Sequence, residues 1–125
     1  MPEKIIINDV GPRDGLQNQA VILEPQQRLA LINALIDAGV KHIEVGSFVS
    51  PVAVPAMRGT AELVAALPMG DYHFSALIPN LKGYELAKAA GIDTANIVIA
   101  ASNTMNEQNI RMNNAQVLSF AKDVL

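Results

Sequence analysis

The sequence predicts an α/β fold in which helices cover a parallel β-sheet. Three observations lead to this prediction. Short β-branched runs alternate with helical patterns along the 125 residues, glycine and proline separate these segments at regular places, and the apolar runs are almost continuous, as in strands buried on both faces. Half of the residues are apolar and 17% are charged, which is typical of a globular chain.

Four segments are expected to form strands. They span residues 4–10, 40–45, 72–78 and 94–101. Each is rich in β-branched or other apolar side chains, and the first and third end at the turn signals Gly11-Pro12 and Pro79-Asn80.

Four helical patterns follow these strands in turn. The first begins at Pro25, which suits an opening helical turn, and continues until Gly39 ends it. The other three cover residues 60–67, 81–90 and 114–125, and the polar stretch 102–113 is expected to be a loop. The chain therefore contains four βα units in sequence.

Two architectures share this alternation, an open doubly wound sheet and a closed (β/α)8 TIM barrel, and periodicity does not separate them. The last helical pattern runs to Leu125 without a stop signal. A chain that ends inside a helix is expected to be cut short, and if the fold is a barrel, four of its eight βα units are present, because whole barrels have about 250 residues. Half a barrel leaves strand edges open, which favours association.

Composition excludes several classes of partner and site. Nine lysines and arginines against 12 aspartates and glutamates give a net charge of −3, whereas nucleic-acid-binding proteins usually carry a basic excess. Apolar runs stay well below the about 18 residues of a membrane span, and the first residues resemble no signal or transit peptide. We expect no membrane partner and a cytoplasmic location. The stretch has no cysteine, and its two histidines lack metal-ligand spacing.

In both architectures functional side chains gather at the carboxyl ends of the strands. The loop after the first strand places Arg13 and Asp14 there, between Gly11-Pro12 and Gly15. One interpretation is that Asp14 gives a carboxylate oxygen to a hard divalent cation, while Arg13 offers its donors to a substrate oxyanion. From spacing alone, an Asp-Gly turn with a solvated arginine is the commoner explanation.

Glu44 lies near the end of the second predicted strand, within the apolar segment HIEVG. An acidic side chain in a buried strand is unfavourable unless it is paired, and Arg13 is the nearest candidate partner. A shifted strand boundary that leaves Glu44 exposed is an equal alternative. The segment SFVSP that follows suits either a pocket wall or an ordinary surface connection.

Three segments together carry a family resemblance. VGPRDGLQN at residues 10–18, IEVGSFVSP at 43–51 and PNLKG at 79–83 occur in order and with similar spacing in 3-hydroxy-3-methylglutaryl-CoA (HMG-CoA) lyases. The resemblance covers essentially the whole chain. It implies an aldolase-like (β/α)8 metallolyase, of which this chain would supply the first four βα units of a TIM barrel, with parallel strands inside and helices outside.

The resemblance also implies an activity: retro-Claisen cleavage of HMG-CoA to acetyl-CoA and acetoacetate, with Mg²⁺ or Mn²⁺ as cofactor. By position, Asp14 would be a metal ligand, Arg13 would bind the thioester carbonyl and stabilise the enolate, and Glu44 would orient Arg13 and support proton transfer. The substrate cavity would be lined by Gln17, Ser47, Phe48 and Asn80. The expected partners are an acyl-CoA substrate and a second copy of the chain, as a homo-oligomer and specifically a dimer.

The chain departs from the family pattern at two places. Asp9 stands where the family usually has glutamate, which could alter a support to Arg13, and Asn103 stands where it favours glutamate. The family's His-x-His metal ligands, its asparagine ligand and its loop cysteine belong to the second half of the barrel, beyond these residues. Two alternatives therefore stay open: a lyase for a related thioester, such as citramalyl-CoA or an isoprenoid-derived analogue, and a half-barrel interaction module without catalysis. In isolation, residues 1–125 are expected to show no useful activity.

Overall fold

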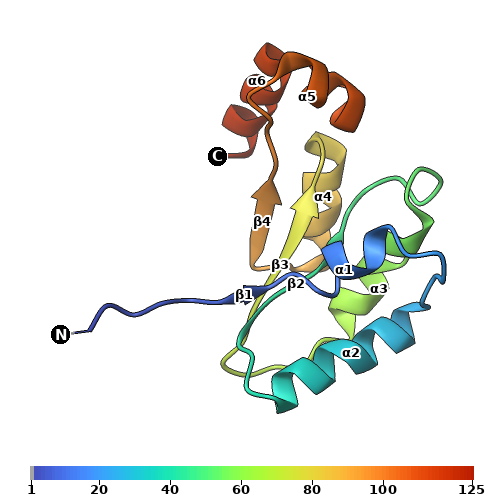
Figure 1. The fold of residues 1–125 in the computed structure, drawn as a ribbon, viewed down its shortest axis with the longest axis vertical. Helices are drawn as coiled ribbons and strands as arrows, with labels where there is room; N and C mark the ends of the chain where they lie inside the picture. Colours follow the sequence, from blue (N-terminus) through green and yellow to red (C-terminus); the bar gives the residue numbers. More distant parts are fainter. Residues whose placement is uncertain (1) are drawn as a thin grey trace.

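Four parallel strands form the sheet of this α/β chain, as the alternation of segments predicts. The computed structural model describes residues 2–125, and its sheet has the order β1-β2-β3-β4 (Figure 1). The neighbouring strands pair in parallel. Their bounds are Asn8–Asp9 for β1, His42–Ser47 for β2, His73–Ile78 for β3 and Thr94–Ile97 for β4.

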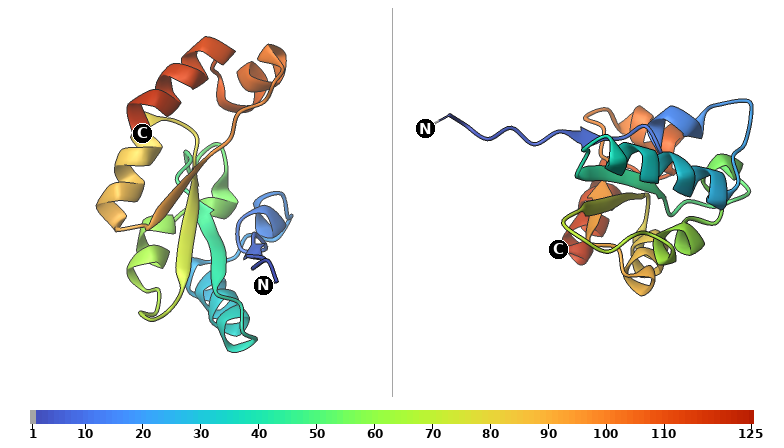
Figure 2. Two further views of the ribbon diagram at one scale, coloured as in Figure 1. Left: turned by 90° about the vertical axis from the view of Figure 1, so that its left-hand side faces the viewer. Right: turned by 90° about the horizontal axis from the view of Figure 1, so that it is seen from below.

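Three helices cover one face of this sheet, and α2, α3 and α4 pack against one another and against β2 and β3 (Figure 2). Two more, α5 and α6, lie beyond the carboxyl end of β4 (Figure 1). No helix within residues 2–125 is long and apolar enough to cross a bilayer. The bounds are Asp14–Gln17 for α1, Pro25–Asp37 for α2, Pro55–Met57 for the 3-10 turn η1, Thr60–Ala65 for α3, Leu81–Ala90 for α4, Asn103–Ile110 for α5 and Asn114–Val124 for α6.

The hydrophobic core lies between the sheet and its helices, in two clusters. The first joins α2, α3, β2 and β3, and the second joins β3, α4 and α6. Burying one such side chain stabilises the fold by about 2 kcal/mol, so these clusters outweigh individual helix caps at about 1 kcal/mol. The buried members are Ile32, Ile43, Val45, Leu63 and Phe74 in the first cluster, and Phe48, Ala76, Ile78, Ala87 and Phe120 in the second.

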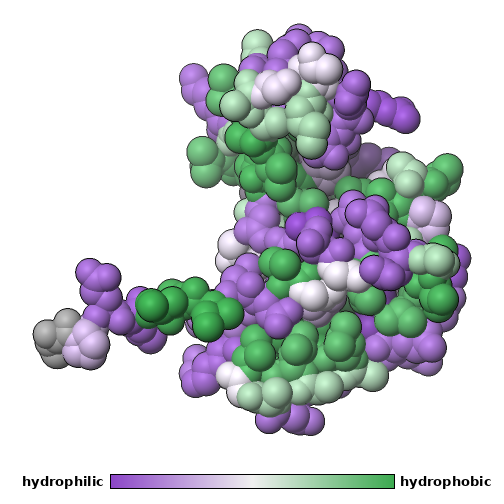
Figure 3. Space-filling model, in the orientation of Figure 1, coloured by the Kyte–Doolittle hydropathy of each residue, from purple (hydrophilic) through white to green (hydrophobic). Residues whose placement is uncertain are grey.

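The two edge strands are shorter than the sequence predicts. The strand expected at residues 4–10 is paired only at Asn8–Asp9, and that expected at 94–101 ends at Ile97. Each edge strand has a partner on one side only, whereas β2 and β3 are six residues long and each has a neighbouring strand on both sides. The arm before β1 projects from the body with apolar side chains uncovered (Figure 3), and Ile5 is 83% exposed.

A second correction concerns the expected loop at residues 102–113, which contains helix α5. Ser102 caps this helix by accepting a hydrogen bond from the Met105 backbone N–H, 3.2 Å away. Asn106 is buried, and its side chain bonds both the N–H and the carbonyl of Ala100, at 2.7 and 2.8 Å. This helix is held in place by polar contacts instead of an apolar face. Its sequence therefore lacks the apolar periodicity that predicts a helix, and it was missed.

Candidate active site

The turn after β1 places Arg13 and Asp14 at the carboxyl end of the sheet. A carboxylate oxygen of Asp9 accepts the Gly11 N–H at 2.8 Å, and a Cβ on Gly11 would lie 2.9 Å from that oxygen, so a larger residue here would displace the Asp9 side chain. The Val10 carbonyl then accepts the N–H groups of Arg13 and Asp14, at 3.1 and 2.7 Å. Asp9 thus stabilises the turn that carries Arg13, and its carboxylate bonds the turn backbone.

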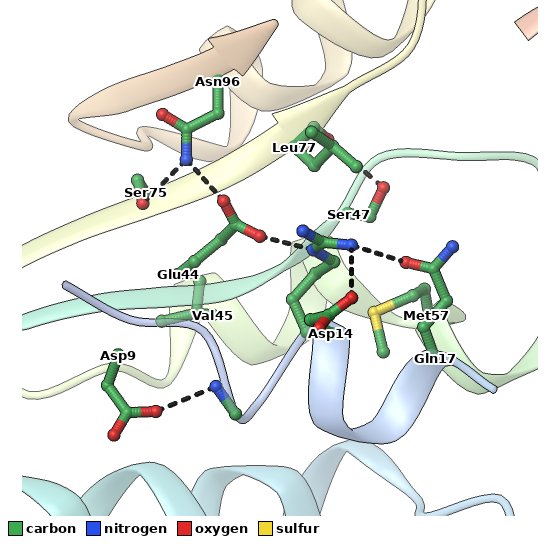
Figure 4. A network of polar contacts seen from close by, with 12 residues as sticks. Asp9, Asp14, Gln17, Glu44, Val45, Ser47, Met57, Ser75, Leu77 and Asn96 are labelled. Carbon is green, nitrogen blue, oxygen red and sulfur yellow. Dashed lines mark hydrogen bonds and ion pairs between the residues drawn. The ribbon is translucent and has the colours of Figure 1, made fainter. Parts of the chain in front are cut away.

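Arg13 and Glu44 form an ion pair at this edge, as the paired-carboxylate interpretation expects. The Arg13 Nε donates to one carboxylate oxygen of Glu44, and the two side chains are 18% and 6% exposed (Figure 4). Arg13 Nη1 donates to Gln17 at 3.2 Å and lies 3.4 Å from Asp14. An ion pair with so little exposure needs further hydrogen bonds to offset its desolvation. The guanidinium has them, because its Nη1 group also contacts Gln17 and Asp14.

The second oxygen of Glu44 is held by a residue that the sequence analysis missed. Asn96 Nδ2 donates to it at 2.6 Å and to the Ser75 hydroxyl oxygen at 3.2 Å (Figure 4). Asn96 is a polar residue within the apolar strand segment TANIVIAA. A polar residue in an apolar strand needs a partner when it is buried, and this is the one signal that Asn96 gives in the sequence; which partner it takes depends on the register of β3 and β4.

A second buried arginine, also missed, lies on the helix-covered side of the sheet. Arg28 of α2 is fully buried, and its donors reach the Arg58 carbonyl at 2.8 Å, the Thr60 hydroxyl at 3.2 Å and the Val45 carbonyl at 3.3 Å. Burial lowers the pKa of Arg28 from its ordinary value. Gly46 allows this approach, because a Cβ there would lie 2.6 Å from Arg28 Nη2. We assign Arg28 a structural role.

Three residues expected to line the substrate cavity make other contacts in the structure. The buried Ser47 hydroxyl donates to the Leu77 carbonyl at 3.3 Å. Phe48 is 6% exposed and packs in the second core cluster, because the chain leaving β2 turns its ring toward α4 and α6 rather than toward Arg13. Asn80 caps α4 by accepting the Gly83 N–H at 2.8 Å. Of the expected cavity residues, the structure brings Gln17 to Arg13.

A cavity of about 270 Å³ lies beside the Arg13 guanidinium and the Gln17 amide. Two larger hollows, of about 480 and 350 Å³, lie near the amino ends of the strands, away from this site. In parallel sheets the carboxyl ends carry function, so the smaller cavity is the better candidate. Arg13 and Gln17 supply the polar side of this cavity, where a substrate carbonyl would meet the guanidinium. Its apolar walls include Val49, Val54, Leu77, Ile78, Val98 and Ile110.

Asp14 is the one candidate cation ligand of the sequence analysis at this edge. Its side chain is 65% exposed and carries a carboxylate, the ligand type that Mg²⁺ and Mn²⁺ prefer, with one oxygen 3.4 Å from Arg13 Nη1. Residues 2–125 hold no group of three or more metal-ligating side chains. The two histidines, at the amino ends of β2 and β3, stack on each other with ring centroids 4.4 Å apart. Within residues 2–125, Asp14 is therefore the residue that can contribute a ligand to a divalent cation, and it can contribute one.

Comparison of the sequence with known proteins identifies one family, and the individual relatives agree with it. The sequence profile of the HMGL-like family matches residues 4–125. The (R)-citramalyl-CoA lyase of Chloroflexus aurantiacus is 44% identical over 93% of this chain, which corresponds to 40% of that enzyme. The 3-hydroxy-3-isohexenylglutaryl-CoA/hydroxy-methylglutaryl-CoA lyase of Pseudomonas aeruginosa is 42% identical over 88% of this chain and 37% of the enzyme.

A solved structure extends the likeness to the fold. The HMG-CoA lyase from A. baumannii, in complex with coenzyme A and 3-methylmalate, superposes with a TM-score of 0.91 and 38% identity, over 95% of this chain and 39% of that one. The chain thus spans about two fifths of the length of these relatives, and its four βα units match part of their TIM barrel.

Proposed function

The chain belongs to the HMGL-like family of carbon–carbon lyases, and from this premise we propose that it forms the N-terminal half of a divalent-metal-dependent acyl-CoA lyase. The proposed reaction is the retro-Claisen cleavage of HMG-CoA to acetyl-CoA and acetoacetate. The observation that carries the proposal is the pair of the partly exposed Arg13 with the buried Glu44 carboxylate at the carboxyl end of the sheet, beside a cavity whose walls are largely apolar.

In this reaction a general base, which we propose comes from the second half of the barrel, takes the proton of the tertiary hydroxyl as the adjacent carbon–carbon bond breaks and the hydroxyl carbon becomes the ketone of acetoacetate. The electron pair of that bond passes to the thioester carbonyl, which becomes an enolate oxygen. Glu44 engages Arg13 Nε, and Gln17 and Asp14 engage Nη1, so Nη2 is the donor that would meet this oxygen. One preorganised donor of this kind lowers the barrier by about 3 kcal/mol.

Asp14 would contribute one oxygen ligand to the divalent cation. When bound, the cation would make the tertiary hydroxyl easier to deprotonate. Gln17 accepts a hydrogen bond from Arg13 Nη1, as Asp14 of the same helix α1 does, and would keep the guanidinium directed at the cavity. The remaining ligands are proposed to come from the second half of the barrel.

The test is cleavage of HMG-CoA by the longer polypeptide that contains this chain. We expect acetoacetate to form only with Mg²⁺ or Mn²⁺ present, to stop with EDTA, and to resume when the cation is restored. Cleavage that persists in EDTA would contradict the role of Asp14. A longer polypeptide that cleaves no acyl-CoA would favour the half-barrel interaction module.

Citramalyl-CoA is the second candidate substrate, and a particular residue favours it. Asn103 begins α5, where HMG-CoA lyases favour glutamate, and its amide donates to Glu107 at 2.9 Å. The similar enzyme of C. aurantiacus is a citramalyl-CoA lyase. Comparing kcat/KM for HMG-CoA, citramalyl-CoA and 3-hydroxy-3-isohexenylglutaryl-CoA decides between them, and a preference for citramalyl-CoA would identify the second function.

A further inference from the structure

We propose that Asn96 is a positioning residue: it fixes the Glu44 carboxylate so that Glu44 can hold Arg13 in one orientation beside the cavity. This inference rests on the proposed function, because it assigns Asn96 an effect on the reaction through Arg13. The contacts themselves come from the structure. Asn96 reaches Arg13 through Glu44, the residue to which both donate.

Both oxygens of Glu44 are engaged, each from a different direction. Arg13 Nε donates to Oε1 from the loop after β1, and Asn96 Nδ2 donates to Oε2 from β4 at 2.6 Å. The Glu44 side chain is 6% exposed, so solvent gives little alternative hydration. A buried carboxylate with one oxygen unpaired is free to rotate about its last torsion, and the second contact prevents this rotation.

The orientation of the Asn96 amide is determined by chemistry. An ionised carboxylate only accepts hydrogen bonds, so the amide must present its NH₂ group to Glu44. The same nitrogen donates to the Ser75 hydroxyl oxygen at 3.2 Å, which holds the amide from β3. The network thus crosses β2, β3 and β4 and ends at Arg13 (Figure 4).

Packing alone does not account for asparagine at position 96. Its neighbours Ala95 and Ile97 pack against the second core cluster, whereas Asn96 points to the opposite face of the sheet. There it lines, with Ser75 and Thr94, a hollow of about 130 Å³. An apolar residue would fit this strand segment as well, but it would leave the second oxygen of Glu44 without its donor.

The experiment compares Asn96→Asp and Asn96→Ala with wild type in the full-length protein. Asn96→Asp keeps the shape of the side chain, removes the donor and adds a negative charge beside Glu44. Asn33→Asp is the matched control, because Asn33 is exposed on α2 and receives the same charge change. With HMG-CoA, we expect kcat to fall about tenfold in Asn96→Ala, the size of one hydrogen bond to a charged group, and further in Asn96→Asp, with smaller changes in KM.

A second readout follows Arg13 directly and needs no activity. The Nε–H resonance of Arg13 in a ¹H–¹⁵N spectrum is assigned by its loss in Arg13→Lys. We expect this resonance to shift and to exchange faster with solvent in both Asn96 variants, and to stay unchanged in Asn33→Asp. If Asn96 had only a structural role, its variants would lower thermal stability, but the Arg13 Nε–H resonance would stay in place. The fall in kcat would then not exceed the change in KM.

The outcomes separate the two proposals. An unchanged Arg13 resonance together with an unchanged kcat in Asn96→Ala would overturn the positioning role. If Asn96→Asp does not fold, Asn96→Ala alone tests this role. A wild-type protein that cleaves no acyl-CoA would refute the proposed function, whereas the Arg13 resonance would still establish or reject the control of Arg13 by Asn96.

Discussion

The two faces of the sheet differ in what their side chains do. On the face covered by helices, residues such as Ile43, Val45 and Phe74 are buried together and form the core. On the opposite face, Glu44 and Asn96 form a polar network that ends at Arg13. Alternate residues of β2 therefore face the core and the polar network in turn. We expect substitutions on the two faces to have separable effects.

Each face carries one arginine, and the pair shows the difference most clearly. Arg13 keeps 18% of its side chain exposed and is paired with a carboxylate, so it can reach a ligand. Arg28 is fully buried and bonds mainly backbone and hydroxyl oxygens. Exposure and the kind of partner, rather than residue type, distinguish the candidate active-site arginine from the structural one.

Arg13→Gln is expected to have the largest effect, and the effect falls on activity. In the full-length protein, kcat should drop about 100- to 1,000-fold, because a preorganised donor is lost where charge develops. Stability should fall by only about 1–2 kcal/mol, since Glu44 loses its charged partner but keeps Asn96. Acetoacetate formation and thermal unfolding measure the two effects. Turnover at the wild-type rate would remove Arg13 from the site.

Arg28→Ala should show the opposite pattern. It removes donors from the Arg58 carbonyl and the Thr60 hydroxyl and leaves a cavity behind α2, so we expect a loss of about 3 kcal/mol in the free energy of unfolding. Activity per folded molecule should stay near wild type. Arg58→Ala is the control, because the Arg58 side chain is 49% exposed and pairs with Glu24 at the surface. Equal losses in both variants would contradict the structural role of Arg28.

Gly46→Ala tests how tightly Arg28 is packed against β2. A Cβ at this position would lie 2.6 Å from Arg28 Nη2 and 2.9 Å from Thr60 Cγ2, so these side chains must move. Overpacking of this kind destabilises by about 1–3 kcal/mol. Combining it with Arg28→Ala should reduce the penalty, because the new methyl group then enters vacated space. Strictly additive unfolding energies in this double-mutant cycle would show that the two residues do not compete.

The sequence predicts the covered face of the sheet better than the polar one. Apolar periodicity and glycine stops indicate α2, α4 and the central strands, because these elements depend on burial of side chains. The edge strands depend on pairing with another strand, which their own residues do not encode, and both were predicted too long. Helix α5 is held by polar contacts such as those of Asn106, and periodicity does not detect these.

The candidate site divides in the same way. Arg13 and Glu44 are identifiable because each is charged and lies next to a strand end, and the expected pairing of the two is confirmed. Asn96 and Ser75 carry no charge, and their importance depends on the register that brings β3 and β4 beside Glu44. Phe48 shows the same limit: the segment after β2 was left open between a pocket wall and a surface connection, and the direction of this side chain depends on packing against Phe120 and Ala87.

The smallest effect is expected at Asp71, which belongs to neither face of the sheet. Lys41 donates a hydrogen bond to Asp71 at 3.2 Å, and this bond and the lysine charge hold the pKa of the carboxyl below its ordinary value. A lowered folded-state pKa contributes stability above the unfolded pKa of about 3.9, and this contribution is lost as the pH falls through the folded-state value. Both side chains are mostly exposed, so solvent screens the pair strongly.

Comparing the melting temperatures of wild type and Asp71→Asn across pH measures this contribution. Wild type should melt slightly higher near neutral pH, and the difference should vanish in strong acid, where Asp71 is protonated in both states, and in about 1 M salt, where the Debye length is about 3 Å. A difference that persists under both conditions would mean that Asp71 stabilises the turn before β3 by something other than its charge. In that case the amino ends of the strands would be a third region of the sheet, with a stabilising role separate from those of the two faces.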